Sequence, residues 1–112
     1  MKNLVAGIDI GGTNTVYALV DETGAIHACD SFPTNSFQNF DDYIIAIRDG
    51  ILEIAGKLDF SHKILGIGIG APNGNYYTGC IESAANLLWK DNLPIAEKLK
   101  VLFGGIPVVL TN

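Results

Sequence analysis

A short polar loop near the start of the chain carries the residue types best suited to binding chemistry. Asp9 ends an apolar run, and the segment Gly11-Gly12-Thr13-Asn14 follows one residue later. Paired glycines place no Cβ in the path of a ligand and allow the dihedrals of a tight turn, so backbone N–H groups can approach an anion closely. The side chains of Thr13 and Asn14 add further donors. The loop therefore predicts a phosphate-binding site.

The carboxylate of Asp9 points to a cation beside that phosphate. A carboxylate at the end of an apolar strand is costly to bury unless it is paired or near a metal ion. Mg²⁺ that accompanies ATP is the natural partner, held directly or through water. A simpler interpretation stays open at this point, with Gly11-Gly12 an ordinary hairpin turn and Asp9 an exposed or capping carboxylate.

Two other glycine patterns match the spacing of known phosphate motifs but fail in their chemistry. The interval from Gly7 to Gly12 is that of a P-loop, yet Thr13 stands where that loop needs a lysine. Residues 66–71, GIGIGA, fit the letters of the dinucleotide fingerprint. Their glycines fall within an expected strand, and residues 72–74 form a turn where a helix should open. Neither pattern therefore predicts a nucleotide site.

Composition indicates a compact domain and argues against a nucleic-acid surface. The 112 residues are 48% hydrophobic and 17% charged, with a formal net charge of −5. The seven Lys and Arg are scattered, whereas binding to nucleic acid needs cations gathered on one face. The first apolar run is interrupted at Asp9, too early for a signal peptide or a membrane span, so we expect a cytoplasmic protein. Cys29 and Cys80 belong to no metal-binding pattern and are expected to be free thiols.

The elements that must position the loop follow the order β-β-β-α-β-α-β. Apolar, β-branched runs between turn signals predict strands over 4–10, 15–21, 25–31, 64–70 and 106–110, with a small β excursion over 76–82. Apolar residues at spacings of three and four predict a helix over 40–58, with Asn39 as its N-cap. A second, short helix is expected from Pro94 to near Gly104. A meander followed by helical crossovers to parallel strands is typical of a mixed α/β sheet.

The strand over 64–70 has glycine on every second position. Gly66, Gly68 and Gly70 line one face, while bulky residues line the other. Bare backbone on a strand face predicts that something packs or binds there very closely. Residues 32–36 are predicted to form a loop, and residues 72–75 a turn with an Asn-Gly hairpin signal. No segment of the sequence indicates a domain boundary.

Taken together, these segments resemble the ROK family, which contains repressors, open reading frames of unknown role and sugar kinases including bacterial glucokinases. Residues 6–13, AGIDIGGT, resemble its first phosphate motif, and residues 66–74 resemble its strand and "GAPG" sugar loop. Residues 79–89 resemble its "G…APNLxW" segment, and residues 106–112 resemble the strand that enters its "NDAN" motif. The resemblance runs through the whole chain in order. It implies the ribonuclease-H-like lobe of the actin-like ATPase and hexokinase superfamily.

The resemblance also assigns roles. The phosphates of ATP would be cradled by Gly11, Gly12, Thr13 and Asn14, with Mg²⁺ near Asp9. The hydroxyls of a hexose would meet Gly70, Asn73, Asn86 and Asn112. The catalytic Asp of the family would follow Asn112 directly, and the family's zinc site lies further on. We therefore expect residues 1–112 to be the N-terminal lobe of a longer, glucokinase-like hexose kinase, without a catalytic residue and inactive as an isolated fragment.

Departures from the family pattern leave some assignments open. Asn73 stands where Gly is usual and Ala85 where Pro is usual, so the identity of the hexose stays open. Asn73 alternatively serves its turn, and Asn86 alternatively caps a local bend. Trp89 and Leu87 are expected in the core. The adjacent tyrosines Tyr76 and Tyr77 fit either an exposed flap or an oligomer contact. The sequence does not decide between them, so a homodimer stays open.

Three other functions share part of this pattern. A ROK-type sugar-responsive regulator would need a DNA-binding segment, and only Met1-Lys2-Asn3 precedes the first strand here. An actin-like or chaperone-like ATPase shares the phosphate hairpin but not the segment 86–89. A non-catalytic binding lobe is the third. The kinase accounts for most of the motifs.

Overall fold

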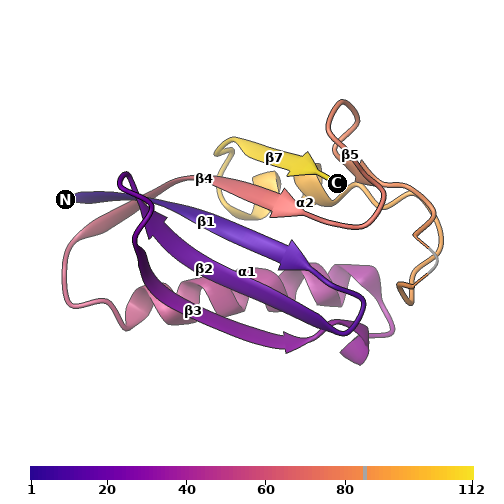
Figure 1. The fold of residues 1–112 in the computed structure, drawn as a ribbon, viewed down its shortest axis with the longest axis horizontal. Coiled ribbons are helices and arrows are strands. Elements are labelled where there is room, and N and C mark those ends of the chain that lie inside the picture. The colour runs from indigo at the N-terminus through magenta and orange to yellow at the C-terminus, as the bar shows by residue number, and fades with distance from the viewer. Residues whose placement is uncertain (85) are drawn as a thin grey trace.

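The computed structural model, which describes residues 1–84 and 86–112, is built around one mixed sheet with the strand order β3-β2-β1-β4-β7 (Figure 1). The strands of this sheet are β1 Lys2–Ile10, β2 Asn14–Asp21, β3 Ile26–Pro33, β4 His62–Gly70 and β7 Val108–Thr111. A small second sheet pairs β5 Gly74–Asn75 with β6 Cys80–Ile81. The helices are η1 Thr34–Ser36, a 3₁₀ turn, and α1 Phe40–Gly56 and α2 Ile95–Leu102.

Chain direction follows the predicted order. Strands β1, β2 and β3 form an antiparallel meander, and β4 and β7 then add in parallel beside β1. The α1 crossover joins β3 to β4, and α2 precedes β7. This is the mixed α/β lobe expected from the sequence. Among the residues that the structure describes, no helix has the length and apolar character needed to cross a membrane.

The core lies between the sheet and the two helices, which both cover the same face (Figure 1). Alternate residues of β1 point into it because a strand has a side-chain period of two. The apolar stripe of α1 meets them, as the spacings of three and four predicted. Its buried members include Ile44, Ile47, Ile51 and Ile54. The predicted N-cap is confirmed, since the side chain of Asn39 accepts a hydrogen bond from the N–H of Asp41 at 2.7 Å.

Several predicted boundaries are wrong by one or two residues. Strand β3 continues through Pro33, which opposes Asn14 on an edge strand, where a missing N–H is tolerated. Helix α1 ends at Gly56 and not at residue 58, because the N–H of Leu58 bonds to the carbonyl of Ala55 and tightens the last turn. Residues 34–36, expected as loop, form η1.

The glycine face of β4 is only partly covered within the described chain. A Cβ at Gly66 would approach the carbonyl oxygen of Pro107 to 3.2 Å, but at Gly68 and Gly70 it would meet no described heavy atom within 4 Å. Within the described chain nothing therefore packs closely at 68 and 70, and close binding of a ligand on this face stays a prediction. The reason for the open face is that both helices pack on the opposite face of the sheet.

Two glycines of α1 give a matched test of this packing. A Cβ at Gly50 would lie 2.5 Å from the ring of Tyr17, whereas a Cβ at Gly56 would meet nothing within 4 Å. We predict that Gly50→Ala lowers the free energy of unfolding by about 1–3 kcal/mol through overpacking. Gly56→Ala should leave it unchanged or raise it by up to about 1 kcal/mol through helix propensity. Urea unfolding of both variants measures the difference; equal effects would contradict the packing of α1 on β2.

Candidate functional site

The carboxyl ends of three parallel strands meet at one edge of the sheet. Register places Asp9 of β1 beside Gly70 of β4, and Gly70 beside Thr111 of β7. Ligands of open α/β sheets bind outside the carboxyl ends of the strands. The side chain of Asp9 is exposed at this edge, so it bears no burial cost of the kind that the sequence argument considered.

A cleft of about 430 Å³ opens at this edge. It brings together most of the residues that the sequence assigned to phosphate and sugar, from segments far apart in the chain. Thr13 and Asn14, both exposed, lie outside its lining. The lining residues are Asp9, Ile10, Gly11, Gly12, Gly70, Ala71, Pro72, Asn86 and Asn112.

Residues of η1 hold three successive carbonyl groups of the glycine loop. The Thr34 hydroxyl donates to the carbonyl oxygen of Gly11 at 2.7 Å, and the Asn35 amide donates to that of Gly12 at 3.0 Å. The N–H of Thr34 donates to the carbonyl oxygen of Thr13 at 2.9 Å. The carbonyls of Gly11, Gly12 and Thr13 therefore all have partners within the protein.

This anchoring sets the direction of the loop N–H groups. In a trans peptide the C=O and the following N–H point in opposite directions, so a held carbonyl fixes the N–H of the next residue. The N–H of Gly11 closes the hairpin onto the carbonyl oxygen of Asn14 at 2.9 Å. The N–H groups of Gly12 and Thr13 donate to no backbone oxygen in the described chain. Successive free N–H groups form the concavity that binds anions.

Behind Thr34 lies a buried chain of hydroxyl groups. The Thr15 hydroxyl lies 2.9 Å from that of Thr34 and 2.7 Å from that of Tyr43. Because the Gly11 carbonyl can only accept, the donors must run from Tyr43 through Thr15 to Thr34. Burial raises the pKa of Tyr43 above its ordinary value, which keeps the phenol protonated as this direction requires.

Sequence reasoning missed this support. Thr15, Thr34, Asn35 and Tyr43 carry no local motif, and the partners are separated by 19 to 28 residues in the sequence. The only available signal was polarity: a threonine and a tyrosine occupy positions of the apolar pattern that must be buried. Buried hydroxyls require hydrogen-bond partners, and that requirement alone predicts a polar network without locating it.

The Asn86 segment packs directly against the glycine loop. A Cβ added to Gly12 would lie 2.8 Å from the amide nitrogen of Asn86. Leu87 and Trp89, which follow Asn86 in the chain, are buried, which confirms their predicted place in the core. The indole N–H of Trp89 donates to the carbonyl oxygen of Phe37 at 3.1 Å. Ala85, singled out as a departure from the family pattern, lies outside the described residues.

Asn73 lies outside the cleft lining. The N–H of Gly74 bonds to the carbonyl oxygen of Ala71 at 3.2 Å, and Asn73 in this turn has a φ of 54°. Left-handed backbone suits Gly or Asn, so the turn alone accounts for an Asn where the family usually has Gly. Asn73 lines an adjoining hollow of about 470 Å³ that also contains Asn112 and the exposed pair Tyr76 and Tyr77.

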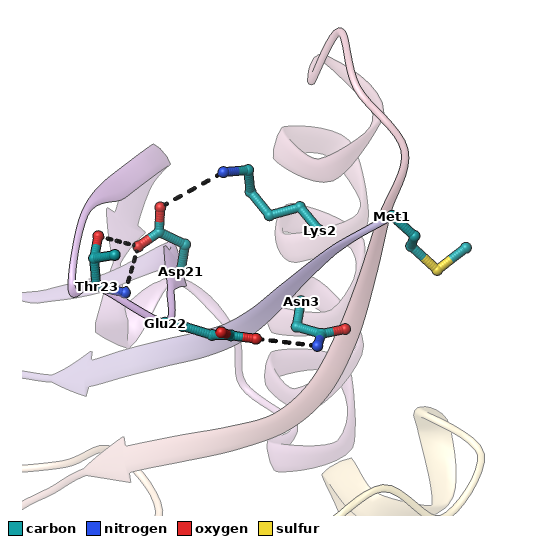
Figure 2. A pocket seen from close by; sticks show the side chains of 6 residues that line it. All are labelled: Met1, Lys2, Asn3, Asp21, Glu22 and Thr23. Carbon is teal, nitrogen blue, oxygen red and sulfur yellow. Dashed lines mark hydrogen bonds and ion pairs between the residues drawn. The ribbon is translucent and has the colours of Figure 1, made fainter.

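A further polar hollow lies at the opposite end of the strands (Figure 2). Its main side chain, Asp21, is occupied by the β2–β3 turn: it accepts hydrogen bonds from the N–H and the hydroxyl of Thr23 at 2.8 and 2.6 Å. His27 lies 2.6 Å from its second oxygen. The Thr23 and His27 hydrogen bonds hold the pKa of Asp21 well below its usual range. Asp21 is therefore explained as a turn residue.

Comparison with known proteins identifies the family. The ROK family model matches residues 5–112. The chain belongs to the ROK family. The matched residues include the glycine loop and the cleft described above.

Relatives within the ROK family include sugar kinases. The glucokinase of Streptomyces coelicolor is 33% identical over 110 residues, which cover 97% of this chain and 32% of that enzyme. The chain thus spans about a third of the length of the curated relatives it matches. A structure of the ROK family glucokinase from Streptomyces griseus in complex with glucose and AMPPNP aligns with a TM-score of 0.77 at 28% identity, over 97% of this chain and 33% of that one.

A ROK family regulator shares the fold. The structure of a transcriptional regulator homologous to the E. coli MLC protein aligns with a TM-score of 0.81 at 17% identity, over all of this chain and 28% of that one. Similarity at this level of identity shows the architecture alone.

The contact between Gly12 and Asn86 provides a test of the cleft. Gly12→Ala should displace the Asn86 amide, because the new methyl group would lie only 2.8 Å from the amide nitrogen. Since that amide ends a flexible side chain, we expect little change in the melting temperature. The affinity for a ligand bound in the cleft should fall about tenfold, because one or two hydrogen bonds to that ligand would be lost. Gly68→Ala, which meets nothing within 4 Å, is the folding control. Unchanged ligand affinity in Gly12→Ala would contradict a shared site.

Proposed function

We propose that this chain is the N-terminal lobe of an ATP-dependent hexose kinase, and that the cleft holds the phosphates of ATP beside the sugar. The observation that carries the proposal is the composition of the cleft. Asp9, Gly12, Gly70, Asn86 and Asn112 come from four separate segments and line one cavity. No single motif in the sequence requires that meeting.

The phosphate side fits a nucleoside triphosphate. The free N–H groups of Gly12 and Thr13 would donate to phosphate oxygens, and the side chains of Thr13 and Asn14 would add donors from the edge of the loop. Asp9 presents an exposed carboxylate to the same cleft. It would hold Mg²⁺ directly or through water, since hard cations prefer carboxylate oxygen. ATP would supply the phosphoryl group.

The other side of the cleft fits a sugar. Asn86 and Asn112 offer both donors and acceptors to vicinal hydroxyls. Gly70 keeps backbone accessible, because no described atom lies within 4 Å of its missing Cβ. Asn73 lines the adjoining hollow, which shares Asn112 with the cleft, and it would contact the sugar from there. Glucose is the first candidate, because the Streptomyces griseus relative was solved with glucose and AMPPNP.

The transfer step itself belongs to the longer protein in this proposal. Phosphoryl transfer depends on positioning, charge stabilisation and a residue that accepts the proton of the attacking hydroxyl. We assign that residue to none of the 112 positions, and the chain spans only about a third of its curated relatives. A cytoplasmic location follows from the proposed use of ATP.

A sugar-responsive regulator is the alternative within the family. It would use the same cleft to bind sugar without transferring phosphate. The regulator structure shares the fold at 17% identity, whereas the glucokinase relatives reach 33%. The higher identity to the glucokinases favours the kinase.

A hexose screen separates the two functions. The full-length protein is incubated with ATP, Mg²⁺ and glucose, mannose, fructose or an N-acetylated hexose, and ADP release is followed by a coupled assay. We expect release that depends on sugar, with glucose the preferred substrate. Sugar binding without ADP release on any of these hexoses would contradict the kinase and support the regulator.

The role of Asp9 has its own test. We predict that Asp9→Asn, which removes the charge and keeps the shape, lowers kcat by about 10- to 100-fold, as the loss of a metal-orienting group does. Hexose affinity should stay the same. Asp59→Asn in the α1–β4 connection, another exposed carboxylate, is the matched control and should retain full activity. An unchanged kcat in Asp9→Asn would exclude the Mg²⁺ role.

A further inference from the structure

We propose that Asn35 is a positioning residue that couples the two halves of the cleft, so that nucleotide and sugar each strengthen the binding of the other. The inference rests on the proposed function for the identity of the two ligands. Asn35 does not line the cleft and belongs to no motif of the sequence.

One side-chain amide bridges the two ligand-bearing segments. The Asn35 nitrogen donates to the carbonyl oxygen of Gly12 at 3.0 Å, and the Asn35 oxygen accepts from the N–H of Leu88 at 3.0 Å. The partners lie 23 and 53 residues away in the sequence. Because the amide group is planar and rigid, its two hydrogen bonds fix the distance between the glycine loop and the Asn86 segment.

The phosphate side receives this constraint through a single peptide plane. The carbonyl of Gly12 and the N–H of Thr13 belong to the same trans peptide, so holding one orients the other. Thr13 N–H is one of the two loop donors with no backbone acceptor in the described chain. Asn35 therefore acts on the phosphate site through a group that it does not touch.

On the sugar side, the constraint acts at Leu88, two residues after Asn86. Leu88 is held by Asn35, and Leu87 and Trp89 beside it are buried, so the segment is fixed on both sides. The Asn86 amide itself lies close to Gly12, within 2.8 Å of where a Cβ would be. A shift of the glycine loop would thus be passed to the sugar side chain through both contacts.

Asn35 is itself held firmly. It follows Thr34, which is fully buried and bonded to the Gly11 carbonyl, and it precedes Ser36, whose hydroxyl donates to the carbonyl oxygen of Pro33 at 2.8 Å. Its φ and ψ of −93° and 36° depart from helical values within η1. A rigid bridge between two sites makes their binding free energies interdependent, and the coupling must be reciprocal.

Two substitutions separate the arms of the bridge. Asn35→Ala removes both hydrogen bonds. Asn35→Asp keeps the acceptor for Leu88 N–H, but it replaces the donor to Gly12 with a carboxylate. Gln38→Ala is the matched control, an exposed amide in the same β3–α1 connection that makes no hydrogen bond to a described residue.

The experiment measures glucose affinity of the full-length protein by calorimetry, with and without saturating AMPPNP. We expect AMPPNP to tighten glucose binding at least about fivefold in the natural protein and in Gln38→Ala, the lower end of ordinary allosteric coupling. The ratio should fall to near one in Asn35→Ala. Asn35→Asp should bind glucose alone within about twofold of normal while losing about tenfold in AMPPNP affinity, as expected for one lost hydrogen bond to a positioned group.

Hydrogen exchange gives a second readout that needs no ligand. The N–H of Leu88 should lose protection in Asn35→Ala and keep it in Asn35→Asp. Loss of Leu88 N–H protection in one variant only distinguishes a bridge from general destabilisation, which would lower that protection equally in both variants.

The outcomes are separable from the proposed function. Coupling without ADP release would overturn the kinase and support the bridge. Sugar turnover with no coupling in the natural protein, or with a ratio unchanged in Asn35→Ala, would overturn the bridge and leave the kinase standing. If neither ligand binds, the proposed function fails, and equal Leu88 exchange in both variants would overturn the bridge as well.

Discussion

The hydroxyl of Thr34 holds the Gly11 carbonyl at 2.7 Å, and the remainder of the site depends on this contact. A glycine pair can adopt many conformations, so its sequence alone does not aim its N–H groups anywhere. The bonds from η1 to three successive loop carbonyls remove that freedom. Since each peptide is planar, fixing a carbonyl also fixes the direction of the N–H group in the same peptide.

That contact depends in turn on the packing of the whole lobe. The Thr34 hydroxyl is reached by Thr15 of β2 and, through it, by Tyr43 of α1. Tyr43 also packs against the ring of Trp89, with ring centroids 4.5 Å apart, next to the Asn86 segment. The helix that covers the sheet therefore supports both sides of the cleft, and a change in its packing would affect the residues proposed to bind phosphate and those proposed to bind sugar together.

Sequence reasoning located what local patterns determine. The alternation in β1, the apolar spacing of α1 and the Asn39 cap each reflect a local physical rule, and each was predicted correctly. It was incomplete where distant segments decide. The extension of β3 to Pro33 depends on pairing with Asn14, and the empty face at Gly68 depends on where the helices pack. The meeting of Asp9 with Asn86 in one cleft could be expected only from family resemblance, because no local rule brings residues so far apart together.

The central claim is that the backing of the glycine loop aims the N–H groups of Gly12 and Thr13 at bound phosphate. Titration of the ¹⁵N-labelled full-length protein with AMPPNP and Mg²⁺ tests it most directly. The account predicts large amide shifts at Gly12 and Thr13 that saturate together, while Gly24, in the turn at the other end of the strands, stays unchanged. Binding of AMPPNP that leaves the Gly12 and Thr13 amides unshifted would contradict the account.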